Sequence, residues 1–224
     1  DYPQVEEGRN FANKLWNASR FRQMQGTTDG INELPEVDKL SIYDIDILQK
    51  LDSLNDELSA GYSSYKFQEI ANRLYDFFWS QFCDWYLESI KLCLRNDADQ
   101  SRKKTVLAVV DTILSGYLIQ LHPYMPHITE ELWEKLGFGK DGELLMQRIL
   151  PHEKILDKYD RDLVLQAGQR TNAIHEATTK ARHIKAQYNL AANRNVKFYL
   201  QAQDSWVIDE LDVFKLLSGA GEII

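Results

Sequence analysis

Apolar residues recur every three or four positions along most of this chain, which is the spacing of one helix face. The clearest run lies at 41–61, with Ile42, Ile45, Leu48, Leu51, Leu54 and Leu58 on this spacing. Further helices are predicted at 3–25, 64–94, 100–121 and 127–137, separated by short segments where Gly and Pro gather. Four or five antiparallel helices form a bundle, so the predicted fold class is mainly α.

The predicted helix at 64–94 is apolar around most of its circumference. A helix of this kind is not stable when exposed, so its aromatic residues belong mainly in a core. These are Phe77, Phe78, Trp79, Phe82, Trp85 and Tyr86. We therefore expect this helix to be the central one, enclosed by the others.

The pattern changes near residue 153. Residues 159–190 predict one more long helix with few apolar positions, 195–200 alternates like a strand, and 205–217 predicts a short helix. The last residues, GEII, look like the start of another strand. We predict a helical bundle at 1–152 and, at 153–224, a long basic helix with a small α/β appendage. The chain is expected to be a fragment of a larger protein.

Composition and motifs narrow the class of protein. The 224 residues are 44% hydrophobic, which is enough for a core. We see no signal peptide and no apolar run near the roughly 20 residues that span a bilayer, so a cytoplasmic protein without a membrane partner is expected. Cys83 and Cys93 point to different helix faces and suggest neither a disulfide nor a metal site.

Catalytic motifs are not found. The sequence has no Gly-rich phosphate loop, no nucleophile elbow and no HExxH pair, so no catalytic residue is predicted. His175 and His183 are predicted to be surface histidines. His122 and His127 flank a Pro-containing turn, where a hydrogen bond that stabilises the turn is the expected role.

Charge is distributed unevenly. The formal net charge is −8, yet residues 8–25 contain four cations and no acid, namely Arg9, Lys14, Arg20 and Arg22. Residues 163–197 hold six Lys and Arg against Glu176 alone. Segregation of this kind gives a basic surface on an acidic protein, and that surface favours an anionic partner.

The first predicted helix has two distinct faces. Phe11, Leu15 and Ala18 form an apolar stripe. The opposite face holds Arg9, Asn10, Asn13, Lys14, Asn17, Arg20 and Phe21. A large aromatic residue among amides and cations fits a single-stranded RNA loop, because bases stack on aromatic rings while Asn, Arg and Lys bind base edges and phosphates. Two simpler interpretations stay open: a solvated charged face, and a Phe21 turned back into the bundle.

Four segments carry a resemblance to a known family. RNFANKLWNASRF resembles the start of the anticodon-binding domain of valyl-tRNA synthetases, which are class I aminoacyl-tRNA synthetases. YKFQEIANRLYDFFWSQFCDWYLESIK and LHPYMPHITEELWEKL resemble later helices of that domain, and TKARHIKAQYNLAANRNVKFYL resembles the segment after it. A motif similar to HPYMPHITEELW also occurs in isoleucyl- and leucyl-tRNA synthetases. NKLWNASRF is more specific and favours the valyl enzymes.

The resemblance implies a function for the first helix. It implies that Asn13, Lys14, Asn17, Arg20 and Phe21 meet the anticodon loop, with Arg9 and Arg22 as secondary candidates for the tRNA backbone. Phe21 would stack on a base, Arg20 and the two amides would read base edges or brace the loop, and Lys14 would neutralise phosphate.

The resemblance also implies what the whole enzyme does. It would be a valine-tRNA ligase that uses ATP and Mg, with its catalytic and editing domains elsewhere in the same chain. The residues present here would be non-catalytic and need no cofactor. The implied partners are tRNA for valine and the missing catalytic domain, with neither DNA nor a membrane.

Two alternative functions remain at this stage. One is the same domain of an isoleucyl- or leucyl-tRNA synthetase. The other is a non-catalytic helical scaffold whose basic face binds an acidic protein. For the long basic helix, the sequence does not decide whether Lys180, Arg182 and Lys185 contact tRNA or the rest of the enzyme.

Overall fold

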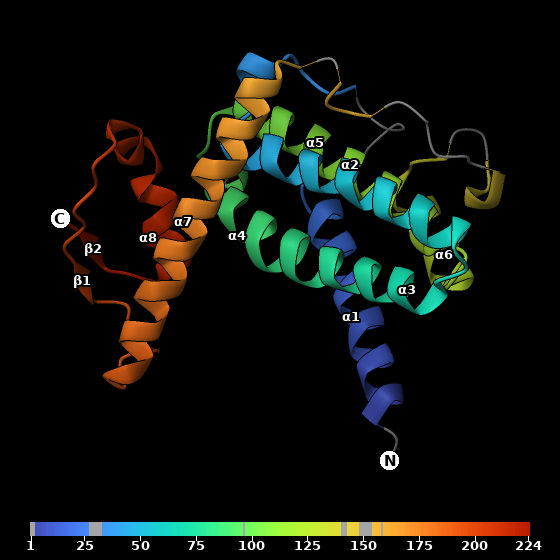
Figure 1. The fold of residues 1–224 in the computed structure, drawn as a ribbon, viewed down its shortest axis with the longest axis horizontal. Coiled ribbons are helices and arrows are strands. Elements are labelled where there is room, and N and C mark those ends of the chain that lie inside the picture. The colour runs from blue at the N-terminus through green and yellow to red at the C-terminus, as the bar shows by residue number, and fades with distance from the viewer. Residues whose placement is uncertain (1–2, 27–32, 96, 140–142, 148–153, 158) are drawn as a thin grey trace.

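The computed structural model describes residues 3–26, 33–95, 97–139, 143–147, 154–157 and 159–224. It is mainly α-helical, as predicted (Figure 1). The bundle helices are α1 (Pro3–Gln23), α2 (Ile42–Ser63), α3 (Phe67–Asp76), α4 (Leu87–Ser89), α5 (Gln100–Leu121) and α6 (Pro126–Leu136). Short 3-10 turns lie at Val37–Lys39 and Leu145–Gln147.

The predicted helix at 64–94 is continuous but changes its winding. Between α3 and α4, residues Phe77–Tyr86 form a π-helix, and Ile90–Leu94 continue after α4 as a 3-10 helix. Single-turn π-bulges are the usual form of this winding, so a segment of 10 residues is unusual. It carries all six of the aromatic residues that the sequence placed in the core.

The most enclosed helix is α5, not the predicted helix at 64–94. It packs against α1, α2, α3 and α6, and 13 of its 22 residues are buried. The π-helical segment instead lies at the edge of the bundle: Phe78 and Phe82 are buried, whereas Trp79 and Trp85 are half-buried. The ring of Phe78 stacks on Tyr117 of α5 with centroids 4.8 Å apart. The expectation of a central third helix was therefore wrong.

By length and composition, α5 is apolar enough to cross a membrane, which corrects the expectation that no run approaches that length. Its most apolar window, however, is 72% buried against the other helices. The core helix of a bundle needs the same composition as a membrane span, and burial among the other helices accounts for it here.

Capping residues fix several helix ends. Ser41 caps α2 through a capping box in which its hydroxyl accepts from the Asp44 amide and the Asp44 carboxylate accepts from the Ser41 amide. Gly137 ends α6 with a positive φ of 72°, a left-handed conformation that favours glycine. Nδ1 of His122 lies 2.8 Å from the Thr129 hydroxyl, so His122 stabilises the turn before α6, as predicted.

Buried carboxylates connect the helices. Asp44 is fully buried and binds Arg102 of α5 and the hydroxyl of Tyr86. Asp52 of α2 accepts the amides of Ile155 at 2.9 Å and Leu156 at 3.0 Å. Because a buried carboxylate is stable only when it is hydrogen-bonded, each of these groups fixes how its partners are placed.

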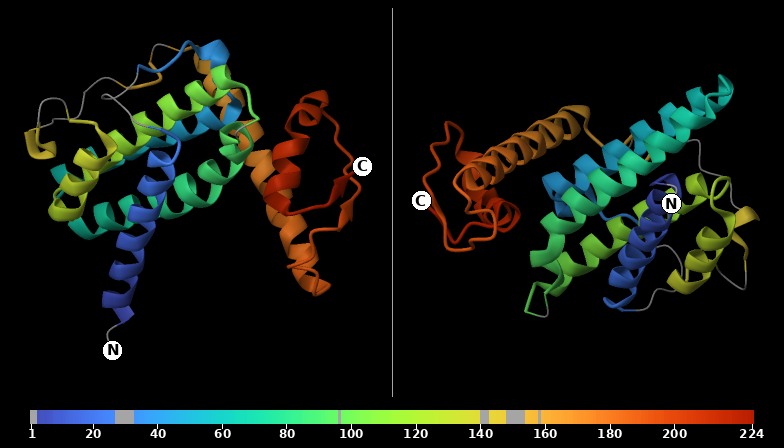
Figure 2. Two further views of the ribbon diagram at one scale, coloured as in Figure 1. Left: turned by 180° about the vertical axis from the view of Figure 1, so that it is seen from behind. Right: turned by 90° about the horizontal axis from the view of Figure 1, so that it is seen from below.

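Helix α7 (Arg161–Gln187) packs against both α2 and α8. Its N-terminal half buries Val164, Ala167 and Ile174, and the Thr171 hydroxyl donates to the Ile42 carbonyl of α2 at 3.2 Å. Its C-terminal half packs against α8 (Leu211–Ser218). The long helix thus connects the bundle with the last part of the chain (Figure 2).

The C-terminal residues form the small strand–helix–strand unit that the sequence predicts. Strands β1 (Lys197–Phe198) and β2 (Glu222–Ile223) pair in parallel, with a 3-10 turn at Ser205–Glu210 before α8. Gly219 ends α8 with a positive φ of 63°. Each strand has only 2 residues, which is shorter than the alternating run at 195–200 suggests.

Candidate nucleic-acid interface

Helix α1 presents the two faces that its sequence predicts. Phe11, Leu15 and Ala18 are buried, which confirms the apolar stripe. The N-terminal half of the helix extends away from the bundle (Figure 1). On the face opposite the stripe, Asn13, Asn17 and Arg20 are exposed and available to a partner, whereas Lys14 and Phe21 are half-buried.

Three candidate residues lie together on the exposed face. Asn13, Asn17 and Arg20 are exposed and follow each other at spacings of four and three residues, one helical turn apart. Within the described part of the chain, none of the three side chains makes a hydrogen bond or an ion pair. Their amides and guanidinium thus form a row of free donors and acceptors.

Phe21 lies at the edge of this row. Its ring is half-buried and packs against the hydrophobic core, so part of it is directed toward the bundle and part remains accessible. The alternative in which Phe21 turns back into the bundle is therefore partly right. Phe21 follows Arg20 directly in the sequence. The accessible part of its ring could therefore stack on a base next to one that Arg20 binds.

Lys14 is held by the π-helical segment. Its ammonium lies 2.7 Å from the Asp84 carboxylate and 3.8 Å from the centre of the Trp79 ring. Both contacts draw the charge toward the bundle and leave the side chain only 22% exposed. A phosphate would have to compete with Asp84, so positioning α1 on the bundle is the role that this geometry shows for Lys14.

Arg22 is not available to a tRNA backbone, which corrects its place among the candidates. The side chain is 4% exposed, and its guanidinium forms a two-pronged ion pair with Asp111 of α5 at 2.5 and 2.8 Å. Arg22 lies next to the apolar stripe, where the helix faces α5. Arg9, in contrast, is exposed and pairs with Glu6 at 3.1 Å.

A stack of aromatic rings beside α1 was missed. Phe11 stacks on Tyr75 with centroids 5.2 Å apart, and Tyr75 stacks on Trp79 at 5.4 Å, where Lys14 covers the outer ring. Tyr75 and Trp79 are partly exposed. The signal in the sequence is Tyr75 four residues before Trp79, but Trp79 was assigned to the core and Tyr75 was given no role.

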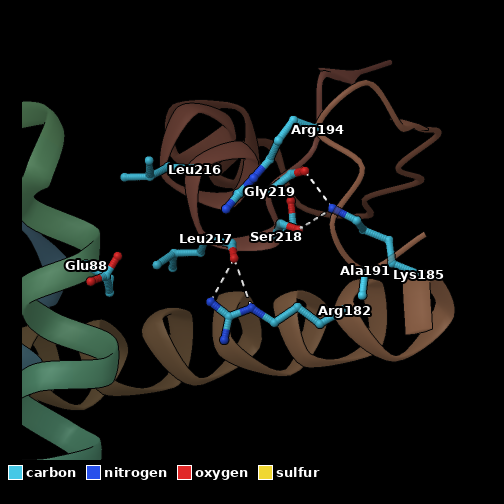
Figure 3. Close-up of a pocket in the computed structure, with 9 residues that line it drawn as sticks. All are labelled: Glu88, Arg182, Lys185, Ala191, Arg194, Leu216, Leu217, Ser218 and Gly219. Atoms are coloured by element: carbon cyan, nitrogen blue, oxygen red, sulfur yellow. Dashed lines mark hydrogen bonds between the residues drawn. The ribbon is translucent and has the colours of Figure 1, made fainter. Parts of the chain in front are cut away.

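The basic residues of α7 do not all face solvent. The Arg182 guanidinium donates twice to the Leu217 carbonyl, at 2.7 and 2.9 Å, and the Lys185 ammonium donates to the carbonyl of Gly219 at 2.7 Å (Figure 3). These bonds satisfy carbonyls at the C-terminal end of α8, where the helix dipole favours cations. Lys180 is exposed.

Burial sets the chemistry of the cysteine thiols among the described residues. Burial raises the pKa of the Cys83 thiol to about 12, so it is not a thiolate at neutral pH. Cys83 and Cys93 are both free thiols. In the part of the chain that the structure describes, no group of three or more His, Cys, Asp and Glu residues is placed to hold a metal ion.

Comparison with known protein families identifies the family of this helical bundle. Residues 44–200 match the family described as the anticodon-binding domain of tRNA ligase. The chain belongs to this family. The matched range begins within α2, so the α1 face of this anticodon-binding domain lies outside it, and the roles of its residues are proposals.

Several curated relatives resemble the chain over most of its length. A valine-tRNA ligase of Prochlorococcus marinus is 38% identical over 89% of the chain, and one of Oceanobacillus iheyensis is 31% identical over 94%. A valine-tRNA ligase of Thermosynechococcus vestitus is 42% identical over 66%. The chain spans only 16–23% of these relatives' own lengths.

Proposed function

We propose that this anticodon-binding domain recognises the anticodon loop of a valine tRNA as part of a valine-tRNA ligase. The observation that carries the proposal is the row of exposed side chains on α1, Asn13, Asn17 and Arg20, beside the half-buried Phe21. In a single-stranded loop the bases are unstacked, and a row of amides and a guanidinium can hydrogen-bond to their edges while the ring stacks on one base.

The bundle would serve as a rigid support for this row. Recognition of an anticodon far from the acceptor end helps catalysis only if the tRNA is held in one orientation. The pairs Arg22–Asp111 and Lys14–Asp84 fix α1 to α5 and to the π-helical segment, so the row keeps its place on the bundle.

Catalysis would belong to other parts of the full-length protein. The relatives are about four to five times longer than the aligned region and are named for a ligase activity. We propose that the remaining parts activate valine with ATP and Mg in the cytoplasm, and that the domain described here is a non-catalytic partner of that catalytic domain within one chain.

The proposal is tested by fluorescence-anisotropy binding of the 224-residue chain to two RNA stem-loops. One has a valine anticodon, and the other differs only in the last two anticodon bases. We expect tighter binding of the valine loop, because base edges are read by groups whose pairing is lost with the wrong base. The preference should disappear in Arg20→Gln and Asn17→Ala, and remain in Lys66→Gln at the far end of the bundle.

Other outcomes identify the alternatives. A preference for an isoleucine or leucine anticodon would assign the domain to one of the related enzymes. Binding that ignores the anticodon bases would contradict base reading by α1 and would favour a basic surface for an acidic protein partner.

A further inference from the structure

A polar groove lies where the C-terminal unit meets the bundle, well away from the row on α1. It consists of two adjoining hollows of about 420 and 620 Å³ that share Arg194, Leu216 and Gly219. Figure 3 shows the first of them. Side chains from the 3-10 segment after α4, from α7 and from α8 line it. Its size is in the range of ordinary ligand sites.

The end of α8 faces this groove, and its partial negative charge is neutralised. The carbonyls at a helix C-terminus would repel an anion. Here Arg182 binds the Leu217 carbonyl, and Lys185 lies 3.4 and 2.7 Å from the carbonyls of Ser218 and Gly219. Lys185 is only 3% exposed, so this arrangement is built into the fold.

Two cations converge on one point of the groove without an acid between them. An atom added as a Cβ on Gly219 would lie 2.5 Å from Nη1 of Arg194 and 3.3 Å from Nζ of Lys185. The neighbouring charge of Arg194 adds to burial in lowering the pKa of Lys185. Like charges held this close raise the energy of the empty groove, and an anion bound between them would remove that repulsion.

The remaining lining adds positive charge. Arg95 and Lys215 are exposed, and in the described residues neither they nor Arg194 form an ion pair. Glu88, Asp97 and Asp212 also line the hollows, but Glu88 is already bound to Lys91 at 2.6 Å. Arg95, Arg182, Lys185, Arg194 and Lys215 thus outnumber the acids five to three.

We infer that this groove binds the phosphodiester backbone of an RNA stem-loop, as a second contact beside the base-reading row on α1. RNA is the occupant that we infer because its backbone places a regular series of phosphates against several separate cations, and because backbone contacts position an RNA without reading it. In Figures 1 and 2, α1 and the lower half of α7 extend from the same side of the bundle, so one RNA can reach both.

The inference rests on the proposed function and is tested with the double variant Arg194→Gln, Lys215→Gln in the 224-residue chain. Both side chains are exposed, so the fold should be retained. We measure binding of the valine stem-loop and of the altered loop at several salt concentrations. Affinity should fall about equally, several-fold, for both loops, and the slope of log K against log salt should become shallower by about one to two.

The matched control removes the same charge elsewhere. Lys66→Gln, Arg73→Gln lies on the opposite part of the bundle and also replaces two exposed cations. An equal loss in this control would mean that only net charge matters and would overturn the groove. Unchanged affinity and slope in the groove variant would also overturn the inference. An acidic protein surface would then be the better candidate for binding in the groove.

The outcome also separates the two proposals. If the parent chain prefers the valine loop while the groove variant binds like the parent, the groove inference fails and the proposed function stands. If neither loop is preferred but the groove variant loses salt-dependent binding, base reading by α1 fails and the groove stands as a backbone site.

Discussion

Arg9 and Arg22 are the same residue type on one helix, yet they have opposite environments. Arg22 stands seven residues after Leu15 and so falls on its side of the helix, whereas Arg9 falls away from it. Helical geometry alone therefore places Arg22 near the core. What the sequence does not contain is its partner, since Asp111 lies 89 positions away and no local pattern links the two.

Arg22→Ala is expected to destabilise the fold by about 3–5 kcal/mol, because it leaves the buried Asp111 carboxylate without its guanidinium. Urea unfolding followed by circular dichroism measures this loss. Arg9→Ala is the control: its pair with Glu6 is exposed, so a change within about 1 kcal/mol is expected. Equal stability in the two variants would show that the Arg22 pair contributes nothing.

Phe21 combines a packing role with a proposed stacking role, and two substitutions separate them. Phe21→Leu keeps apolar bulk at the half-buried position, so stability should change little, but it removes the aromatic face. Binding of the valine stem-loop should weaken by about 1–3 kcal/mol in anisotropy titrations if the ring stacks on one base. Phe21→Ala should weaken binding similarly and also lower the melting temperature.

One combination of results would contradict stacking of the Phe21 ring on a base. If Phe21→Leu binds RNA as the parent does while Phe21→Ala loses both binding and stability, the ring acts only by packing.

At the scale of elements, the helix at 64–94 shows a limit of apolar periodicity as a guide to packing. Its apolar residues are distributed around most of its circumference, so the sequence does not show which side of the helix faces solvent. The structure leaves Trp79 and Trp85 at the edge, where Lys14 covers the first and α7 covers the second. The residues that cover the two rings lie far away in the sequence. The sequence therefore could not show that the rings lie at the edge, and a central helix was expected.

The contact between α7 and Trp85 makes the stability of the fold depend on pH. His175 stacks on Trp85 with ring centroids 4.0 Å apart. Burial, with Lys50 of α2 and Arg182 of α7, lowers the pKa of His175 to about 4. The unfolded chain then binds the proton more readily than the folded one, so this contribution to stability is lost as pH falls from about 6.5 toward 4.

His175→Phe should reduce this dependence, because phenylalanine keeps a ring on Trp85 and does not titrate. Between pH 7 and pH 5 we expect the free energy of unfolding of the variant to fall by about 1–2 kcal/mol less than that of the parent. His183→Gln, an exposed histidine on the same helix, should behave like the parent. Parallel pH curves for the parent and His175→Phe would contradict the assigned pKa.

At the scale of the whole molecule, local signals predicted the elements but not their assembly. The bounds of α5 and the buried stripe on α1 follow from periodicity, and the structure confirms them. The candidate row of Asn13, Asn17 and Arg20 was predicted as well, and it is exposed. The groove at Arg194 was not, because it needs α7, α8 and the segment after α4 to meet in space.

The packing of α7 bears on whether a domain boundary lies near residue 153. Weak apolar periodicity suggested an appendage, yet α7 covers α2 with Val164, Ala167 and Ile174. Removing it would expose the apolar surface that these residues bury, at roughly 25 cal/mol for each Å². The truncation 1–152 should therefore lose cooperative unfolding in calorimetry, while 1–188, which keeps α7, should retain it. A truncation 1–152 that melts sharply, like the 224-residue chain, would instead show that the bundle ends before α7 and that the long helix is an independent addition.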